Sequence, residues 1–360
     1  MGFIFFALII LSGLVFGHLF LSYWIHQGLF PQTSFSLLWR IIPLFLSTLF
    51  IVSSMRMHQS IDLISIYLYR ISVWELGIFY FLFLISFIAW LTHKSFPLIS
   101  LKFLVIISLV LGLIFAGFAT YQGLRIQIRE IDTNLPNLPP QLKNQKIVFF
   151  SDSHLGVVRG QKLSQKIVKT IQSINPQMVL AGGDIFDGEN YQLDQLISPF
   201  QELKMPLIAI TGNHEHFGPS AEFIKALEKA NFQVIDGKKI DLMGLQIAGW
   251  PSERLNAIYE FGHEKMQNWD IDPDRPSILL KHSPDHLSQF SKKFDLFLAG
   301  HSHHGQIFPG NILTRMIFGI YEYGPNFMDK MQIYTSCGIG TWALPMRFPI
   351  PSELIVLNLK

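Results

Sequence analysis

The chain has 360 residues, and its 28 Lys and Arg against 26 Asp and Glu give a formal net charge of +2. Hydrophobic residues make up 49% of the chain and charged residues only 15%, which excludes the disordered and collagen-like classes. The small net charge gives no reason to expect a nucleic-acid partner. The single cysteine, Cys337, excludes an intrachain disulfide framework and a cysteine-rich zinc site.

The apolar excess is concentrated at the start of the chain, because residues 1–121 contain only seven charged side chains. Nearly uncharged runs of about the length that a bilayer core requires lie in this segment. They are Gly2–Ile25, Ile41–Met55 with Ser36–Trp39 joined to it, Leu76–His93 and Phe103–Leu124. Tryptophans near their ends are typical of a membrane interface. We predict an all-α transmembrane domain of about four helices over 1–121, a linker over 122–145 and a globular domain over 146–360.

Other interpretations of the apolar part stay open. The first run would be a cleaved signal peptide, although it lacks a basic start and a clear cleavage site. The runs would otherwise be buried helices of a large soluble protein, although they are long and nearly free of charge. Residues 56–75 mix charge with apolar side chains and would form an interfacial helix. The spans carry no evident paired charges of the kind that mark a transport path.

The basic residues beside the spans bear on orientation. With four spans, both ends of the chain lie on one side of the membrane. That side carries Arg56, Arg70, Arg125 and Arg129, and the other carries Arg40, Lys94 and Lys102. Because cytoplasmic loops are enriched in Lys and Arg, we expect a multi-pass protein of the cell membrane with its globular domain in the cytoplasm.

Five short apolar runs in the globular part each lead into residues able to bind a metal. The runs are Ile147–Phe150, Met178–Leu180, Leu207–Ile210, Ile278–Leu280 and Leu296–Ala299. The residues that follow them are, in the same order, Asp152 and His154; Asp184 and Asp187; Asn213, His214 and Glu215; His282; and His301, His303 and His304. Helical patterns separate the early runs, and this alternation predicts an α/β sheet with a substantial parallel portion.

Polar residues at these strand ends predict a metal centre, because ligands of such sheets bind at the carboxyl ends of the strands. Nine of the 13 histidines fall between His154 and His304. Imidazole and carboxylate donors without Cys suit Mn, Fe or Zn. The donors exceed the needs of one ion, so we predict two divalent ions that share a carboxylate, clamp a phosphoryl group and supply a metal-bound hydroxide for attack on phosphorus. Any one motif alone would be a turn or a structural histidine.

As a set, the five blocks resemble the calcineurin-like metallophosphoesterase superfamily, whose pattern runs D-x-H, G-D-x-x-D, G-N-H-D/E, H and G-H-x-H. The chain reads DSH, GDIFD, GNHE, KH and GHSH in the same order. The resemblance covers roughly residues 145–360. The C-terminal stretch is similar to a membrane-anchored bacterial branch and to transmembrane proteins with a metallophosphoesterase domain. The resemblance implies a four-layer αββα sandwich and a metal-dependent phosphoesterase.

The resemblance also implies a role for each motif residue. One ion would be held by two carboxylates and two imidazoles, Asp152, His154, Asp184 and His303. The second ion would share Asp184 and add an amide and two imidazoles, Asn213, His282 and His301. His214 would not bind metal but would stabilise charge or protonate the leaving oxygen. Asp187 and Glu215 would orient the imidazoles. The chain departs from the family pattern, without losing a ligand, at Gln177, Ser302, His304 and Ala343.

Three features bear on the substrate. The stretch Asn311–Met331 is rich in apolar residues and would line a groove for acyl chains or touch the bilayer, with ordinary core as the alternative. Arg347 would grip a phosphate with both arms of its guanidinium, or cap the sheet. His304 would contact the substrate, or be a solvated neighbour of the ligands.

These observations together predict a membrane-anchored, two-metal phosphoester hydrolase. The connection between Tyr121 and Ile147 is short and keeps the site near the membrane surface, so we expect a lipid-linked or membrane-proximal substrate. The related branch resembles pyrophosphatases of lipid A biosynthesis, which act on UDP-2,3-diacylglucosamine. The alternative is a membrane sensor or transport protein that uses the phosphoesterase fold as a binding module.

Overall fold

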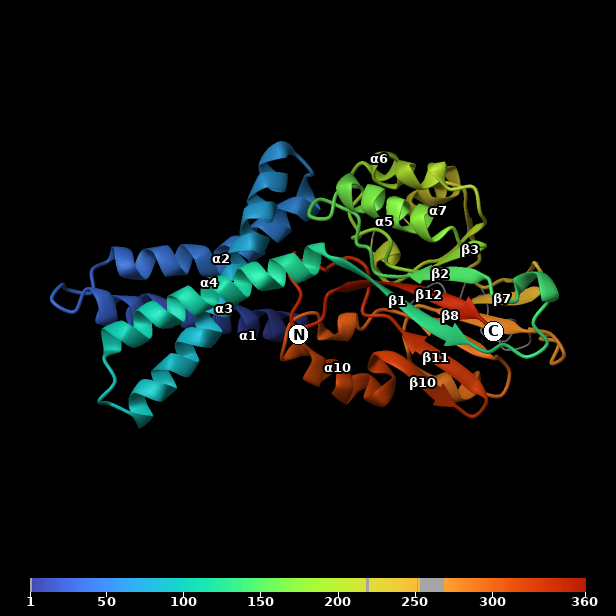
Figure 1. The fold of residues 1–360 in the computed structure, drawn as a ribbon. Helices are drawn as coiled ribbons and strands as arrows, with labels where there is room; N and C mark the ends of the chain where they lie inside the picture. Colours follow the sequence, from blue (N-terminus) through green and yellow to red (C-terminus); the bar gives the residue numbers. More distant parts are fainter. Residues whose placement is uncertain (1, 218–219, 251, 253–268) are drawn as a thin grey trace. The chain divides into compact units, whose positions relative to one another are not determined.

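The computed structural model describes residues 2–217, 220–250, 252 and 269–360. By its internal contacts the chain divides into two compact units (Figure 1). The first unit is Met1–Tyr121 with Ala343–Met346, and the second is Gln122–Trp342 with Arg347–Lys360. In the described residues every strand belongs to the second unit.

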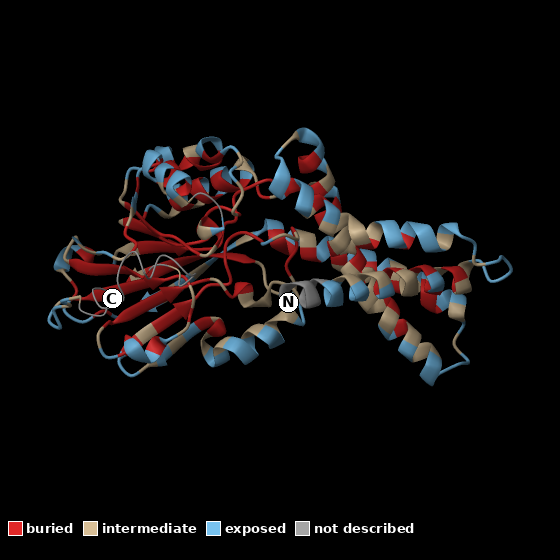
Figure 2. Ribbon diagram, turned by 180° about the vertical axis from the view of Figure 1, so that it is seen from behind, coloured by how far each residue is buried: buried red, intermediate tan, exposed pale blue. Residues whose placement is uncertain are grey.

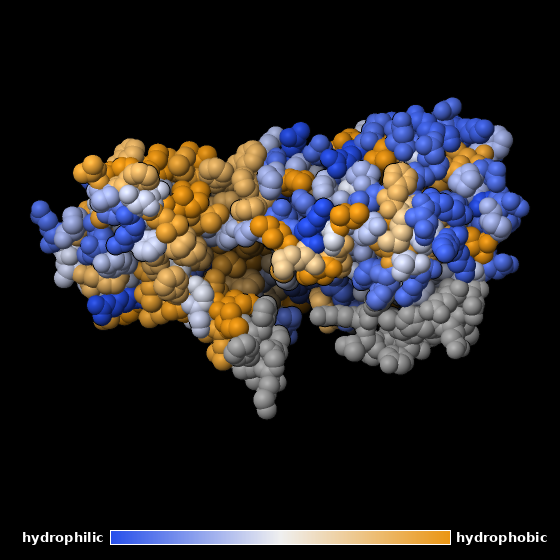
Figure 3. Space-filling model, turned by 90° about the horizontal axis from the view of Figure 1, so that it is seen from below, coloured by the Kyte–Doolittle hydropathy of each residue, from blue (hydrophilic) through white to orange (hydrophobic). Residues whose placement is uncertain are grey.

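Long apolar helices form the first unit. They are α1 (Gly2–Leu29), α2 (Leu38–Gln59), α3 (Leu63–Ser95) and α4 (Leu101–Leu124). In the described part of the chain, these four are long and apolar enough to cross a membrane. Figure 3 shows hydrophobic colouring over most of these helices and hydrophilic colouring over most of the second unit. The prediction of about four apolar helices ahead of the globular domain is confirmed.

The start of α3 corrects the expectation of a separate interfacial helix over 56–75. Arg56 lies in the last turn of α2. Asp62 caps α3, and its carboxylate accepts a hydrogen bond from the N–H of Ser65 at 2.8 Å. From there α3 continues without a break through Glu75 to Ser95. The charged stretch is therefore divided between the end of one span and the first turns of the next.

Hydroxyl groups join the helices, as expected where lipid removes the hydrophobic drive for helix association. Pro43 lies inside α2 and has no N–H for the carbonyl of Trp39, four residues earlier. The hydroxyl of Ser22 in α1 donates to that carbonyl instead, at 2.7 Å. Ser53 in α2 and Ser72 in α3 are likewise 2.7 Å apart between their hydroxyl oxygens. These bonds fix how α1, α2 and α3 pack.

A protonatable pair also lies between α1 and α3. The imidazole of His18 is buried, and its Nε2 lies 3.0 Å from Oε1 of Glu75. Its Nδ1 lies 2.8 Å from the carbonyl oxygen of Leu14, which only accepts, so Nδ1 carries a hydrogen. The contact with Glu75 then requires one further proton between the two side chains. The spans thus contain a pair of ionisable groups that the sequence did not make evident.

The strands of the second unit form two mixed sheets, each six-stranded in the described residues (Figure 1). The first has the order β1 (Ile126–Thr133), β12 (Ser352–Leu359), β2 (Lys146–Phe150), β3 (Met178–Gly182), β4 (Leu207–Ile210) and β5 (Phe232–Val234). The second has the order β10 (Gly324–Met328), β11 (Met331–Thr335), β9 (Leu296–Ala299), β8 (Ser277–Lys281), β7 (Leu245–Trp250) and β6 (Lys239–Leu242). The neighbours β2 to β5 run parallel, as do β7, β8 and β9.

Strand β2 shows how the layers are held together. Its side chains alternate between two apolar cores, as the two-residue period of a strand requires. Val148 and Phe150 pack in the core that includes the helices of the first sheet. Ile147 and Phe149 pack in the core between the two sheets. Figure 2 shows the strands buried and the outer sides of the helices exposed.

Helices cover the outer face of the first sheet (Figure 1). They are α5 (Gln161–Ile174), α6 (Leu193–Ile197) and α7 (Ser220–Lys229). A third apolar cluster, which includes Trp250 and Phe297, covers the outer face of the second sheet. Two mixed sheets flanked by helices confirm the predicted α/β sandwich. The five predicted strands are confirmed to within two residues at each end.

The contact between Ser22 and the Trp39 carbonyl gives a testable prediction. Ser22→Ala should lower the free energy of unfolding by about 0.6 kcal/mol, the mean for such bonds between membrane helices. In a Pro43→Ala background the restored N–H can bond Trp39 within α2, so the cost of S22A should fall toward zero. Unfolding of the full chain in mixed micelles measures both. Thr48→Ala, which removes a bond inside α2 only, is the control, and an equal S22A cost in both backgrounds would contradict the prediction.

Candidate metal centre

Loops at the carboxyl ends of β2, β3, β4, β8 and β9 carry the residues that the sequence singled out. Most of their side chains are buried, and Asn213, His301 and His304 are half-buried. Groups of His and Asp from different loops meet there, with one possible ligand atom from each residue within 4.8 Å of the others in its group. These groups are Asp152, His154 and His303; His154, Asp184 and His214; and Asp184, His282 and His301.

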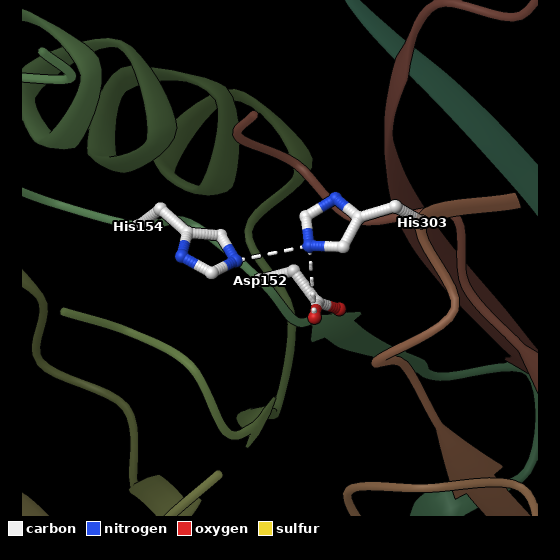
Figure 4. Close-up of side chains that lie close together, drawn as sticks. All are labelled: Asp152, His154 and His303. Carbon is white, nitrogen blue, oxygen red and sulfur yellow. Dashed lines mark hydrogen bonds and ion pairs between the residues drawn. The ribbon is translucent and has the colours of Figure 1, made fainter. Parts of the chain in front are cut away.

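Figure 4 shows the first group, in which the rings of His154 and His303 face each other beside the carboxylate of Asp152. The two Nε2 atoms are 2.9 Å apart, and Nε2 of His303 lies 3.5 Å from Oδ1 of Asp152. Nδ1 of His154 lies 2.9 Å from Oδ1 of Asp187, so Nδ1 carries the hydrogen and Nε2 keeps its lone pair. A divalent cation fits this convergence of imidazole nitrogens and one carboxylate, where it would take the place of the hydrogen between the two Nε2 atoms.

Asp184 connects the first group with the last. Its Oδ2 lies 3.9 Å from Nε2 of His154 and 3.2 Å from Nε2 of His282. Nε2 of His282 lies in turn 3.2 Å from Nδ1 of His301. The buried Oδ1 of Asn213 has no hydrogen-bond partner among the described residues. This oxygen lies next in sequence to His214, whose N–H bonds Asp184, and a divalent cation would give it a partner.

His214 lies against the same residues, and the structure allows it a place in a metal group with His154 and Asp184. Its Nδ1 lies 2.9 Å from the carbonyl oxygen of Asp187, so Nδ1 donates and Nε2 is the nitrogen left for proton exchange. Its backbone N–H donates to Oδ1 of Asp184 at 2.8 Å. The rings of Phe217 and Trp342 flank it, with centroids 4.7 and 6.2 Å away.

Glu215 has a different position from the one expected. Its carboxylate accepts hydrogen bonds from the backbone N–H groups of Asp184, Phe186 and Gly212, at 3.0, 2.8 and 2.7 Å. It therefore holds the loop after β3 against the loop after β4, and the expectation that it orients an imidazole is corrected. Asp187 contacts an imidazole directly, through Nδ1 of His154.

Arg347 also requires a correction. It is buried, and its guanidinium bonds within the fold: Nε donates to the carbonyl of Gly340 at 2.9 Å, and Nη1 to the carbonyl of His303 at 3.2 Å. Its Nη2 lies 3.1 Å from Nδ1 of His303. With every guanidinium nitrogen engaged, Arg347 does not offer a bidentate grip to phosphate. It fixes the loop that carries His303.

The sequence did not single out Glu322, although this residue organises the loop after β9. Its buried carboxylate accepts a hydrogen bond from Nδ1 of His304 at 2.8 Å, and its carbonyl accepts one from the hydroxyl of Ser302 at 2.6 Å. The ring of His304 also packs against that of Tyr323 at a tilt of 35°, with the centroids 4.5 Å apart. Glu322 lies 18 residues from His304 in an apolar stretch, so no motif spacing pointed to it.

Burial dominates the electrostatics of the centre. Burial lowers the pKa of His154 and His303, and that of His301 to about 4, which leaves these rings neutral and able to bind a cation. Burial would lower the pKa of His282 too, but Asp184 and Asp152 raise it to about 10. Burial acts to raise the pKa of Asp184, but neighbouring imidazoles hold it well below its usual range. In the absence of a cation, a proton on His282 balances these carboxylates.

The backbone around the centre is strained. Asp152, His154, Asp184, His301 and His303 all have positive φ, between 44° and 69°, a region that non-glycine residues rarely adopt. Glycines permit the loops to approach this closely. A Cβ at Gly212 would collide with Oδ1 of Asp184, and one at Gly300 would collide with Oδ2 of Asp152. Strain gathered at one cluster of polar residues is typical of a functional site.

Comparison with known proteins assigns the family. A sequence profile described as Calcineurin-like phosphoesterase matches residues 145–305. An uncharacterized metallophosphoesterase of Helicobacter pylori is 31% identical over 268 residues, which span 69% of this chain and 68% of that protein. The chain therefore belongs to the calcineurin-like metallophosphoesterase family. It is a metal-dependent phosphoesterase, and its clustered His and Asp side chains are suited to divalent metal ions.

Relatives also include proteins with membrane segments. A transmembrane protein with metallophosphoesterase domain from Bos taurus is 27% identical over 257 residues, 65% of this chain and 57% of that protein. Together with the four apolar helices, this likeness identifies a membrane protein whose helices contact lipid. A solved structure of a dimetal phosphatase from Danio rerio covers 56% of this chain and 89% of that one, with 11% identity and a TM-score of 0.37.

The glycine contact with Asp184 gives the second prediction. Gly212→Ala should push Asp184 out of place and lower the affinity for Mn²⁺ by at least about tenfold, as loss of supporting contacts does in other metal sites. Isothermal titration of the purified full chain measures the affinity. Gly160→Ala is the matched control, because a Cβ there meets open space. Unchanged Mn²⁺ binding in G212A would contradict the close packing of this loop.

Proposed function

We propose that this chain is a membrane-anchored hydrolase of phosphoesters that uses two divalent ions. The observation that carries the proposal is the position of Asp184 between two groups of possible ligands, one with Asp152, His154 and His303 and the other with His282 and His301. A shared carboxylate between two such groups is the arrangement that a pair of ions needs.

The residues present would divide between two ions. Asp152, His154, Asp184 and His303 would hold one, and Asp184, Asn213, His282 and His301 the other. Oxygen and imidazole donors without thiolate favour Mn, Fe or Zn. Bound ions would act as Lewis acids on the phosphoryl group and on the attacking water.

His214 would manage the proton that hydrolysis transfers. Water oxygen bonds to phosphorus, the P–O bond to the leaving group breaks (an ester bond, or the anhydride bond of UDP-2,3-diacylglucosamine), and one proton of the water ends on the leaving oxygen. The Asp187 carbonyl holds His214 with a hydrogen on Nδ1, which supports Nε2 as the atom that takes up and returns this proton. Phe217 and Trp342 beside the ring would limit the access of bulk water.

The substrate we propose is a lipid-linked phosphoester such as UDP-2,3-diacylglucosamine. Its support is the covalent path of the chain: α4 ends at Leu124 and β1 begins at Ile126, so the catalytic domain follows the last span with one residue between. A site on so short a connection would meet lipid-borne substrates more readily than soluble ones. The larger number of basic residues on the side of the catalytic domain (Arg56, Arg70, Arg125 and Arg129) supports a cytoplasmic position of that domain.

A second candidate, a membrane sensor or transport protein that uses the phosphoesterase fold as a binding module, draws support from the pair of His18 and Glu75. Ionisable groups inside a membrane span are costly and are usually kept for function. The full set of metal-binding side chains favours catalysis, because a module that only binds would not need them all. Turnover that depends on the metal ligands separates the two candidates.

A panel of phosphate esters tests the proposed reaction. The purified full chain, loaded with Mn²⁺, Fe²⁺ or Zn²⁺, should hydrolyse a simple phosphodiester and release UMP from UDP-2,3-diacylglucosamine, and a chelator should abolish both activities. Asp184→Asn should lower turnover by at least about a hundredfold, as expected when a central electrostatic group is removed. Asp194→Asn, at an exposed ion pair with Lys229, is the matched control.

The possible outcomes distinguish the parts of the proposal. Diester hydrolysis without release of UMP would remove the nucleotide-linked lipid and leave the hydrolase. Nucleotide binding without turnover in any metal form would favour the binding module. Full activity in D184N would overturn the shared-carboxylate centre.

The proton-transfer role of His214 gives a separate prediction. His214→Ala should slow hydrolysis of an alkyl ester by about a hundredfold or more, the usual contribution of a positioned acid. An ester of p-nitrophenol, whose leaving oxygen needs no proton, should be affected far less. The comparison of turnover for the two leaving groups is the measurement, with His216→Ala as control. Equal losses for both esters would assign His214 to metal or phosphate binding instead.

A further inference from the structure

Helix α10 (Gly310–Phe318) directly follows the loop that carries His301 and His303, and it has no buried residue. Large apolar side chains stand on its exposed side: Ile312, Leu313, Met316, Ile317 and, just beyond the helix, Ile320. Met316 is 79% exposed and Ile317 62%. The alternative that the stretch Asn311–Met331 is ordinary core is therefore wrong for α10, whereas Tyr321, Met328 and Met331 further along the stretch do pack in the core of the second sheet. An apolar face of this kind, contiguous and turned to solvent, marks an interaction surface.

The side of α10 that faces the protein is the more polar one, which reverses the usual amphipathic pattern. The hydroxyl of Thr314 lies 3.3 Å from Oε2 of Glu322, the carboxylate that also binds His304. The ring of Phe318 meets the ring of His301 edge to face, with centroids 5.9 Å apart. The apolar face is thus held outward by contacts with the metal-site loop.

Lipid is the partner that fits this face. The chain carries four apolar spans, and β1 starts one residue after α4, so the domain that carries α10 is tethered at a bilayer surface. Exposed Arg315 flanks the apolar face and can meet lipid phosphates, as basic side chains of interfacial helices do. We propose that α10 is an interfacial helix that inserts Ile312, Leu313, Met316 and Ile317 among the acyl chains of the membrane.

This contact deepens the proposed function and rests on it in one respect. Because Glu322 and Phe318 tie α10 to His304 and His301, insertion of the helix would bring the metal loop to the level of lipid headgroups. A phosphoester carried by a lipid would then reach the metal centre without leaving the bilayer. The insertion itself does not depend on catalysis.

Depth-dependent quenching tests the insertion. The full chain with Met316→Cys, labelled with a small fluorophore and reconstituted in vesicles of phosphatidylcholine and phosphatidylglycerol, should be quenched strongly when the lipids carry bromine on their acyl chains. Lys169→Cys, at an exposed position of α5, is the matched control and should show little quenching. The parent chain shows whether buried Cys337 takes up label.

Two results would overturn the proposal. Quenching at residue 316 no greater than at residue 169 would place α10 outside the bilayer. Disulfide cross-linking of M316C between two copies, without quenching, would assign the face to self-association. Neither result depends on whether the chain hydrolyses a phosphoester.

Introducing charge on the apolar face tests the link to catalysis. Met316→Glu with Ile317→Glu should lower turnover of a phosphoester embedded in vesicles by about tenfold or more, because charged side chains oppose insertion. Turnover of a water-soluble phosphodiester should change by less than about twofold, as for other surface substitutions. Equal loss of turnover on both substrates would contradict a membrane role for α10. If the parent chain itself does not hydrolyse the soluble phosphodiester, the proposed function is wrong, and the insertion of α10 is judged by the quenching experiment alone.

Discussion

The structure of the catalytic domain depends on the burial of Asp152 and Asp184 at the ends of neighbouring strands. Removing carboxylates from water is costly unless other groups compensate them. Here the compensation comes from backbone N–H groups, such as that of His214, which donates to Asp184, and from the neighbouring imidazoles. Without a cation, a proton on His282 balances the two carboxylates, while His154, His301 and His303 stay neutral. A divalent cation would replace that proton and bind the same imidazole nitrogens.

This requirement explains local features that otherwise look unfavourable. Left-handed backbone at five non-glycine residues costs energy, and Gly212 and Gly300 leave no room for any side chain. Glu215 and Arg347 hold the loops in place. Glu215 accepts hydrogen bonds from three backbone N–H groups, and Arg347 donates to backbone carbonyls. Their contacts hold the donors close together in advance. Ordering of the loops then adds little to the free-energy cost of binding a cation.

The sequence predicted the strands and the polar residues at their ends because both are local signals. A short apolar run such as Leu207–Ile210 identifies a buried strand, and the sheet brings its end to the others. The partners of those residues depend on tertiary packing and were not predictable. Nothing in the spacing distinguishes Glu215, which bonds backbone, from Asp187, which bonds His154. Arg347 looked like a phosphate ligand because its burial is invisible in the sequence.

The same division between local and distant information applies to the apolar residues. Hydropathy identifies four spans, but the pair of His18 and Glu75, 57 residues apart, becomes visible only when α1 and α3 are packed together. In Asn311–Met331, apolar composition alone could not separate core from surface. The exposure of Ile312, Leu313, Met316 and Ile317 decides the question for α10, because the opposite side of the helix, with Thr314 and Phe318, is the one that contacts the protein. The residues that hold α10 in this orientation also contact the loop that carries the metal ligands: Glu322 bonds both Thr314 and His304, and Phe318 contacts His301. A displacement of α10 would therefore be transmitted directly to that loop.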